Sequence, residues 1–412
     1  MIHTAELIHT LNMEHYDALE EYLKAHGTLY GRDFHPLTPN TKKGIIRYGL
    51  QIVSDFNGIA YFQIQKVKTK DGYRRTATAK IHLAQLAEPS IKTKQDLYDD
   101  PSKVYLMASN FSRIMLAYTG DYDLCDISWW NVRRCDYAVD LNVEHQLIHP
   151  YIRLFQRGEL PSKHLTLRRW DSEHGDDNTT MHDENGSLAY NIYGKYWREV
   201  NKNRERQKRK KRIVDPEPWR NVLRFEMELA VDGIEEISLI RKMKTLAYDK
   251  QVLAAVKKKM YKAFKSYSGV GDYYRLDAID NDRQFRLATA TLPSRRGTTA
   301  EEENQKRVSA RIAAVNALDC VASYRGLWDM PAPKLKEVKA ALRYNRKSYG
   351  INPVTIPDNW DIAYLPNLGK QLKRLLEVYD RGGKLAEPET MEQDYDTYAE
   401  DDDPETMETP WD

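Results

Sequence analysis

The alternation of apolar and polar positions predicts a sheet-rich first half of the chain. Side chains that alternate with a period of two, as in strands of a half-buried sheet, mark seven segments. The second and third segments are joined by KTKDG, whose Asp-Gly pair is a signal for a tight hairpin. The seven predicted strands are 44–54, 59–67, 73–84, 132–143, 164–169, 188–194 and 221–230.

Apolar residues at helical spacing predict helices between and after these strands. A polar segment at 171–186 has the composition of a loop, and from about residue 234 onward the pattern is helical. The helical pattern is broken near 268–274 and again at 292–300. The predicted helices are 1–27, 103–118, 145–157, 196–212, 301–324, 333–347 and 367–379.

Together these elements predict an α+β fold in three parts. An antiparallel-sheet domain over 1–265 precedes a helical C-terminal domain over 266–385 and an acidic, disordered tail over 386–412. The tail carries twelve acidic residues and no Lys or Arg, which is typical of disorder. The remaining chain holds 63 basic and 49 acidic residues (61 minus 12), a net charge of +14. Such a body indicates a polyanionic partner, although a solubilising surface would have the same charge.

Composition excludes several classes of protein. No run of about 18 apolar residues occurs, so no membrane span is expected, and the N-terminus lacks the apolar stretch of an export signal. The three cysteines form no CxxC pair, which excludes a disulfide framework and a cysteine-rich zinc site. We therefore expect a cytoplasmic protein without a membrane partner.

Two of the predicted strands combine an apolar face with a face of ionisable side chains. In NVRRCDYAVDLNV the small Ala138 separates two carboxylates, and NVLRFEMELA repeats the arrangement. The ionisable faces hold Arg134, Asp136 and Asp140 on the first strand, and Arg224, Glu226 and Glu228 on the second.

A third strand, SLAYNIYGK, places Asn191, Tyr193 and Lys195 on one face. If the three faces adjoin, carboxylates suited to Mg²⁺ or Mn²⁺ meet a tyrosine and a lysine. A metal polarises a phosphoryl oxygen, and a tyrosine hydroxyl can attack the phosphorus to form a covalent intermediate. The alternative is an ordinary half-exposed antiparallel sheet, which shows the same alternation.

The order of these motifs resembles the replication initiators of rolling-circle elements. R-x-D-x-A-x-D at 134–140, Tyr-x-Lys at 193–195 before a basic helix, and L-R-F-E at 223–226 are similar to the gene II/X type of filamentous phages and to trans-acting plasmid initiators. The segment LKEVKAALRYNRKSYGINPVTIPD is similar to the helical C-terminal region of the phage-type proteins.

What the resemblance implies is a site-specific single-strand nickase. Tyr193 would be the DNA-cleaving nucleophile and Lys195 its electrostatic helper, with a divalent metal, Mg²⁺ or Mn²⁺, as cofactor. Asp136 and Glu226 are the leading metal ligands that the resemblance implies, and Asp140 and Glu228 are further ones. The family usually places a Glu five residues after the tyrosine. Here that position is Arg198, and the Glu follows at Glu199.

A basic run, KNRERQKRKKR at 202–212, follows the proposed nucleophile and holds eight basic residues in eleven. It predicts cations beside a DNA backbone, although a solvated helix face would look the same. The residues expected to contact DNA are Arg134, Arg224, Lys208, Arg209, Lys210, Lys211 and Arg212.

Several alternatives stay open at this level. Tyr196 is a rival nucleophile because it adjoins Lys195, while His145 and His149, four apart, lack a third ligand for a metal. A conjugative relaxase of the same fold and a non-catalytic DNA-binding regulator are rival functions. Expected partners are double-stranded and single-stranded origin DNA. A host helicase or other replication protein, and a second copy of the chain, are left open as further partners.

Overall fold

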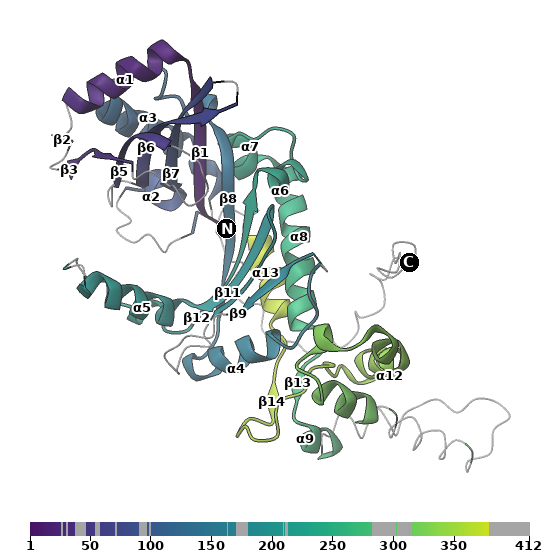
Figure 1. Cartoon of the computed structure of the whole chain (residues 1–412). Coiled ribbons are helices and arrows are strands. Elements are labelled where there is room, and N and C mark those ends of the chain that lie inside the picture. The colour runs from purple at the N-terminus through teal and green to yellow at the C-terminus, as the bar shows by residue number, and fades with distance from the viewer. Residues whose placement is uncertain are drawn as a thin grey trace.

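The computed structural model (Figure 1) describes most of the chain. Described are residues 1–378 except 26–27, 30–31, 38–46, 54–57, 71, 90–96, 99, 163, 170–179, 209, 211–212, 282–301, 303–312 and 314. The predicted acidic tail, the loop at 292–300 and half of the predicted helix at 301–324 lie outside the described residues. In the described part of the chain, no helix is long and apolar enough to cross a membrane.

A long antiparallel sheet forms the centre of the molecule and confirms the predicted α+β class. Its strand order in the described chain is β4-β5-β6-β7-β1-β8-β12-β11-β10-β9. Those strands are β4 (His35–Pro36), β5 (Arg47–Val53), β6 (Ile59–Thr69), β7 (Gly72–His82), β1 (Ile2–Leu11), β8 (Asn131–Asn142), β12 (Val222–Ala230), β11 (Leu188–Gly194), β10 (Thr180–Glu184) and β9 (Thr166–Arg169). Two small antiparallel pairs complete the strands: β2 (Thr28–Leu29) with β3 (Arg32–Asp33), and β13 (Tyr273–Tyr274) with β14 (Tyr364–Leu365).

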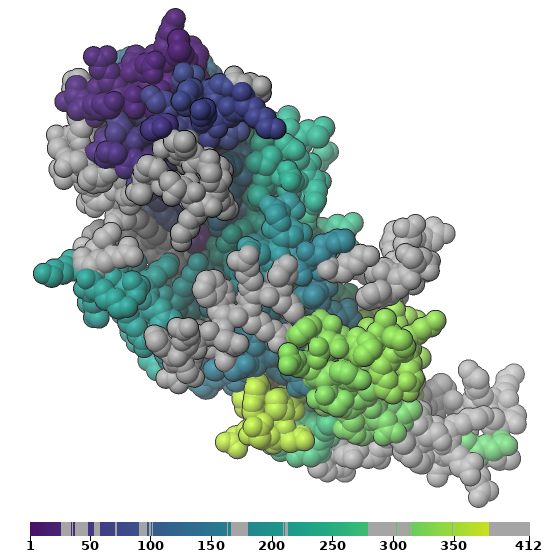
Figure 2. All heavy atoms as spheres, viewed as in Figure 1, coloured from purple at the N-terminus to yellow at the C-terminus, as the bar shows by residue number. Residues whose placement is uncertain are grey.

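Helices surround the sheet. Helices α9 (Leu276–Asn281) and α12 (Ala332–Tyr349) lie at the end opposite to β5–β7, whereas α13 (Gly369–Val378) packs beside α8 (Lys250–Ser268) (Figure 1; Figure 2). The predicted hairpin between β6 and β7 is confirmed, with Thr69 opposite Gly72. The helices are α1 (Met13–Ala25), α2 (Leu83–Ala87), α3 (Val104–Thr119), α4 (His145–Phe155), α5 (Lys195–Lys208), α6 (Val231–Glu235), α7 (Met243–Tyr248), α8 (Lys250–Ser268), α9 (Leu276–Asn281), α12 (Ala332–Tyr349) and α13 (Gly369–Val378). Short 3-10 helices span Pro101–Lys103, Ile127–Trp129, Glu217–Trp219 and Leu327–Asp329.

The predicted N-terminal helix is wrong over its first half. Residues Ile2–Leu11 form β1, which lies between β7 and β8 in the middle of the sheet. The helix begins only at Met13, where the side chain of Asn12 accepts a hydrogen bond from the backbone N–H of His15 at 2.7 Å. The local pattern of residues 2–11 fits a helix or a strand, and hydrogen bonding to β7 and β8 therefore decides that this segment is a strand.

A second correction concerns the predicted loop at 171–186. Its last part forms β10, which pairs with β9 and with β11. Met181 and Asp183 of β10 are buried, so a segment with a polar composition is covered on one face. The loop prediction relied on composition, and composition does not reveal pairing with a distant strand.

The apolar face of β8, β12 and β11 packs against α4 and α8. Aromatic side chains fill this interface: the rings of Phe225 and Phe264 lie 5.3 Å apart, and Phe264 also meets Phe155 at 5.4 Å. Tyr190 stacks on Phe225 at 5.9 Å. Because α8 covers this face, the ionisable face of the same three strands is directed to the other side of the sheet.

The C-terminal part is mainly helical in its described residues, as predicted, and it also contains the β13–β14 pair. It is held to the end of α8 by two asparagine side chains, Asn352 and Asn367, whose Nδ2 groups donate to the carbonyl of Ser268 at 2.6 and 3.0 Å. The predicted domain boundary after residue 265 falls three residues before the end of α8. The division into domains stays a prediction.

Candidate active site

Strand pairing brings the three ionisable faces together. In the register of β11, β12 and β8, Tyr193 lies opposite Arg224, which lies opposite Asp140. Two residues further along the same face, Asn191 of β11 lies opposite Glu226 of β12, and Glu226 lies opposite Ala138 of β8. Glu228 and Asp136 form the next cross-strand pair. The predicted juxtaposition of carboxylates with a tyrosine is thus present in the structure. Lys195, predicted on the same strand face, is instead the first residue of α5, because β11 ends at Gly194.

Asp140 is neutralised by two buried cations. The guanidinium of Arg224 donates to both of its carboxylate oxygens at 2.6 and 2.8 Å, and Lys195 Nζ donates at 3.1 Å. Arg224 is fully buried and Lys195 is 3% exposed. Burial would raise the pKa of Asp140, but these cations, Arg224 first, hold it below its usual value. The arrangement favours a structural role for Asp140, and it keeps Arg224 out of reach of a DNA strand.

Asp136 and Glu228 share a single guanidinium. Arg134 Nε donates to Asp136 at 2.7 Å, and its second terminal nitrogen lies 2.6 Å from Glu228. Thr4 of β1 also donates to Asp136, and Asn191 donates to Glu228 at 2.7 Å. Burial, and then the charge of Asp136, raise the pKa of Glu228. One arginine therefore leaves negative charge uncompensated between these two carboxylates.

Glu226 is oriented by a histidine that sequence reasoning did not consider. His3 Nδ1 lies 2.8 Å from Glu226 Oε1, although β1 and β12 are separated by β8. The pairing of β1 with β8 shifts register between Ile2 and Thr4, a bulge that re-aims His3, and Ala138 on the intervening strand leaves room for the ring. Burial would raise the pKa of Glu226, but His3 in particular lowers it well below its usual value.

Tyr193 donates from its hydroxyl to Glu226 Oε2 at 3.3 Å. The side chain is 1% exposed, and burial followed by the charge of Glu226 raises its pKa above the usual value of 10. The guanidinium of Arg198 lies over the Tyr193 ring, 4.0 Å from its centroid, and acts against this shift. Arg198 NH1 also lies 3.6 Å from Glu226 Oε2. Tyr193, Glu226 and Arg198 are thus in mutual contact.

The rival Tyr196 lies in a different environment. It is the second residue of α5, and its ring packs edge-on against His145 at 4.9 Å and against Trp197 at 5.1 Å. No hydrogen bond between Tyr196 and a site carboxylate occurs among the described contacts. Of the two tyrosines, Tyr193 is the one that contacts an acidic group of the cluster.

Glu199, the displaced glutamate of the motif, has its described ion pairs with other residues of α5. It is 2% exposed and forms an ion pair with Arg206 on the same helix. Of the basic run, Lys208 pairs with Glu205 at 2.8 Å and Lys210 is exposed. Arg209, Lys211 and Arg212 lie outside the described residues, so their predicted contacts with DNA stay predictions.

A divalent metal suits the chemistry of the cluster, whose donors are carboxylate oxygens and an imidazole. The residues that could hold it are Asp136, Glu226 and Glu228, with His3 beside them. Their ligand atoms are drawn toward Arg134 and Arg198 instead of toward a common point. In the part of the chain that the structure describes, three ligand atoms converge within 4.8 Å only at another place.

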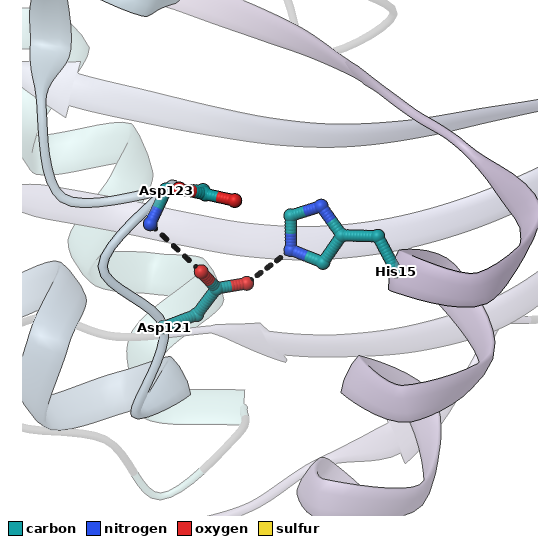
Figure 3. A group of neighbouring side chains, drawn as sticks. All are labelled: His15, Asp121 and Asp123. Carbon is teal, nitrogen blue, oxygen red and sulfur yellow. Dashed lines mark hydrogen bonds and ion pairs between the residues drawn. The ribbon is translucent and has the colours of Figure 1, made fainter.

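That second group consists of His15, Asp121 and Asp123 (Figure 3). His15 lies at the start of α1, and its ring bonds the carboxylate of Asp121 in the turn after α3. Asp121 also accepts a hydrogen bond from the backbone of Asp123 at 2.8 Å. The group could bind a metal ion, but it lies beyond the Leu11 end of β1, whereas His3 and Thr4 of the site lie at the opposite end.

Removing His3 tests how Glu226 is oriented. We expect His3→Ala to raise the pKa of Glu226 toward its usual value, because His3 is the first of the groups that lower it. An NMR titration of the Glu226 carboxyl measures the shift, and a thermal melt checks the fold. His9→Ala is the matched control, because His9 lies on the same strand and its described contacts are with Trp129 and Trp130. An unchanged Glu226 pKa in the His3 variant would contradict the assigned role.

Three groups of the site carried no recognisable sequence signal: His3, Thr4 and Arg198. His3 and Thr4 were hidden because β1 was predicted as a helix. Arg198 was noted only as a departure from a motif. A period-two test applied to residues 2–11 separately would have offered a strand as an alternative.

Comparisons with known proteins give little support of their own. No protein-family model matches the chain, and no curated protein matches it in sequence. One solved structure, described as a rolling circle replication initiator protein from Geobacillus stearothermophilus, aligns over 87% of this chain and 98% of its own, at 10% identity and a TM-score of 0.25. A TM-score of this size does not establish a shared fold.

Proposed function

We propose that this protein is a rolling-circle replication initiator of a phage or plasmid, acting in the cytoplasm as a site-specific nickase. The observation that carries the proposal is the hydrogen bond from Tyr193 to Glu226, a carboxylate held by His3 inside a cluster of acids and arginines. A tyrosine that donates to an ionised carboxylate beside a guanidinium can supply the oxygen that attacks a phosphodiester.

In the proposed reaction the Tyr193 oxygen attacks the scissile phosphorus and its proton passes to Glu226, whose lowered pKa rises as Arg198 moves from Glu226 to the phosphate. The new bond joins Tyr193 to the 5′ phosphate, and the bond from phosphorus to the 3′ oxygen breaks. That oxygen takes up a proton from solvent water and leaves as a free 3′ hydroxyl, which can prime synthesis. Arg198 stabilises the charge that develops on the phosphoryl oxygens. Reversal of these steps with a later 3′ hydroxyl rejoins the displaced strand.

Lys195 has a supporting part in this scheme. It is buried against Asp140 and lies 5.3 Å from the ring centroid of Trp219. From there it positions the end of β11, from which Tyr193 projects, and its charge adds to the local positive potential. We therefore assign it to positioning Tyr193.

The proposed metal is Mg²⁺ or Mn²⁺, held by Asp136, Glu226 and Glu228. When bound, it would polarise a phosphoryl oxygen of the substrate. The shared Arg134 and the raised pKa of Glu228 indicate that this pair of carboxylates has room for more positive charge. Asp140, with its two cations, is the weakest of the four ligands that the resemblance implied.

Supercoiled origin DNA incubated with the protein and Mn²⁺ tests the proposal. We expect open-circular product and a protein–DNA adduct that survives denaturation and carries the DNA on Tyr193. A protein that binds the DNA but yields neither product is a regulator. A conjugative relaxase would give the same products, so a neighbouring coupling ATPase gene separates that use from replication initiation. Binding of a host helicase, and dimerisation, stay proposals to be tested separately.

A further inference from the structure

Three cations follow one another along the exposed helix α5. Arg198, Lys202 and Arg206 are four residues apart, so their side chains lie in one row along the helix. The row starts at the proposed nucleophile, because Arg198 rests on the Tyr193 ring. Helix α5 projects from the molecule at its edge, where a long ligand can approach it (Figure 1; Figure 2).

The row carries more positive charge than its acidic neighbours balance. Glu199, buried beneath it, pairs with Arg206 and lies 3.9 Å from Lys202. Glu226 is shared between Arg198, His3 and Tyr193. Partial burial, and then the charge of Arg198, lower the pKa of Lys202 to about 8. An anion bound beside Lys202 would relieve this crowding of like charges.

We propose that Arg198, Lys202 and Arg206 bind consecutive phosphodiesters of the single DNA strand and guide it to Tyr193. This inference rests on the proposed function, of which it names the strand-binding track. Side chains four apart on a helix have Cβ atoms about 5–6 Å from each other, a spacing that an extended strand can follow with neighbouring phosphates.

Single-stranded DNA fits this row better than a duplex does. Tyr193 is buried, so the scissile phosphate has to enter the fold, and a flexible strand can bend into a place that a stiff double helix cannot reach. At the inner end, Arg198 exchanges its 3.6 Å contact with Glu226 for the scissile phosphate. Charge-assisted hydrogen bonds to a phosphate are short and strong, which favours the exchange.

Binding of a fluorescein-labelled oligonucleotide of about a dozen nucleotides, followed by anisotropy over a salt series, tests the row. We expect Lys202→Gln and Arg198→Gln each to weaken binding about 5- to 10-fold at low salt. Each should also reduce the slope of log K against log salt by about 0.7, the value for one phosphate contact on a single strand. Lys202→Arg, which keeps the positive charge, should have the affinity and the salt slope of the wild type.

Arg204→Gln is the matched control. Arg204 is on the same helix two residues from Lys202, about 200° around its axis, and it bonds Asn201 at 3.2 Å. We expect its affinity and salt slope to equal those of the wild type. Wild-type affinity and slope in Lys202→Gln, with an unchanged melting temperature, would overturn the inference and leave the row as a neutraliser of Glu199.

The binding assay does not depend on nicking. Carried out in a Tyr193→Phe background, it reports on the row even if that tyrosine is not a nucleophile. If the Arg198 and Lys202 variants bind the oligonucleotide like the wild type while the wild type nicks, this inference is wrong and the proposed function stands. If the wild type does not nick while the Arg198 and Lys202 variants bind the oligonucleotide more weakly, the proposed function is wrong and a single-strand-binding surface remains.

Discussion

Replacing Tyr193 by phenylalanine is expected to abolish both nicking and the covalent adduct, with a loss of at least about 10³-fold in the single-turnover rate. The substitution removes the only oxygen through which this side chain can form a bond to phosphorus. The ring that supports Arg198 stays in place, so the fold and the affinity for DNA should change little. Nicking of supercoiled origin DNA and gel detection of the adduct measure the loss.

Tyr196→Phe is the control for this prediction. Tyr196 packs on His145 and Trp197 and makes none of the described contacts with Glu226, so its variant should nick at close to the wild-type rate. The reverse outcome, with an active Tyr193 variant and an inactive Tyr196 variant, would identify Tyr196 as the nucleophile. It would also require α5 to unwind at its first turn, since Tyr196 is held in that turn.

Asp140→Ala is expected to lower the free energy of unfolding by about 3 kcal/mol. Removing one partner of a buried ion pair leaves the other charge uncompensated, which typically costs about 3–5 kcal/mol, and here two cations lose their partner. Asp140 is 28% exposed, which places the expected value at the lower end. Urea unfolding measures the change. Asp136→Ala should alter stability less, because Arg134 retains Glu228 as a partner.

The effect of Asp140 should depend on pH in a defined direction. Because its pKa in the folded protein lies below the unfolded value of about 3.9, its stabilising contribution is fully present above that value. The contribution is lost as the pH falls through the lower, folded pKa. The difference in stability between wild type and Asp140→Ala should therefore be constant near neutral pH and shrink below about pH 4.

An exposed ion pair supplies the comparison for these measurements. Asp277 pairs with Arg275 at 2.6 Å but is 62% exposed, so Asp277→Ala should lower the free energy of unfolding far less than Asp140→Ala. If Asp140→Ala were as mild as Asp277→Ala and instead weakened Mn²⁺ binding, Asp140 would be a metal ligand, as the family resemblance implied. The two roles therefore give opposite patterns of stability and metal affinity.

Local sequence pattern determined much of the fold. Strands β5 to β8, β11 and β12 follow from period-two alternation, because a strand that buries one face requires it. The same alternation assigned Asp136, Tyr193 and Glu226 to one kind of face, before any knowledge of which strands adjoin. It could not tell β1 from a helix over ten residues, and it could not recognise β10 inside a polar segment.

Tertiary structure alone decided which side chains of the site contact one another. Sequence alternation put Asp136 and Asp140 on one face as equivalent carboxylates, yet Asp140 meets two buried cations and Asp136 shares one. His3 reaches Glu226 through a bulge and past Ala138, and Arg198 reaches Tyr193 because α5 starts directly after β11. The sequence determined which side chains face the same side, since that depends on backbone geometry within one strand. Which of them meet depends on register and bulges between strands distant in the chain, and only the folded protein sets those.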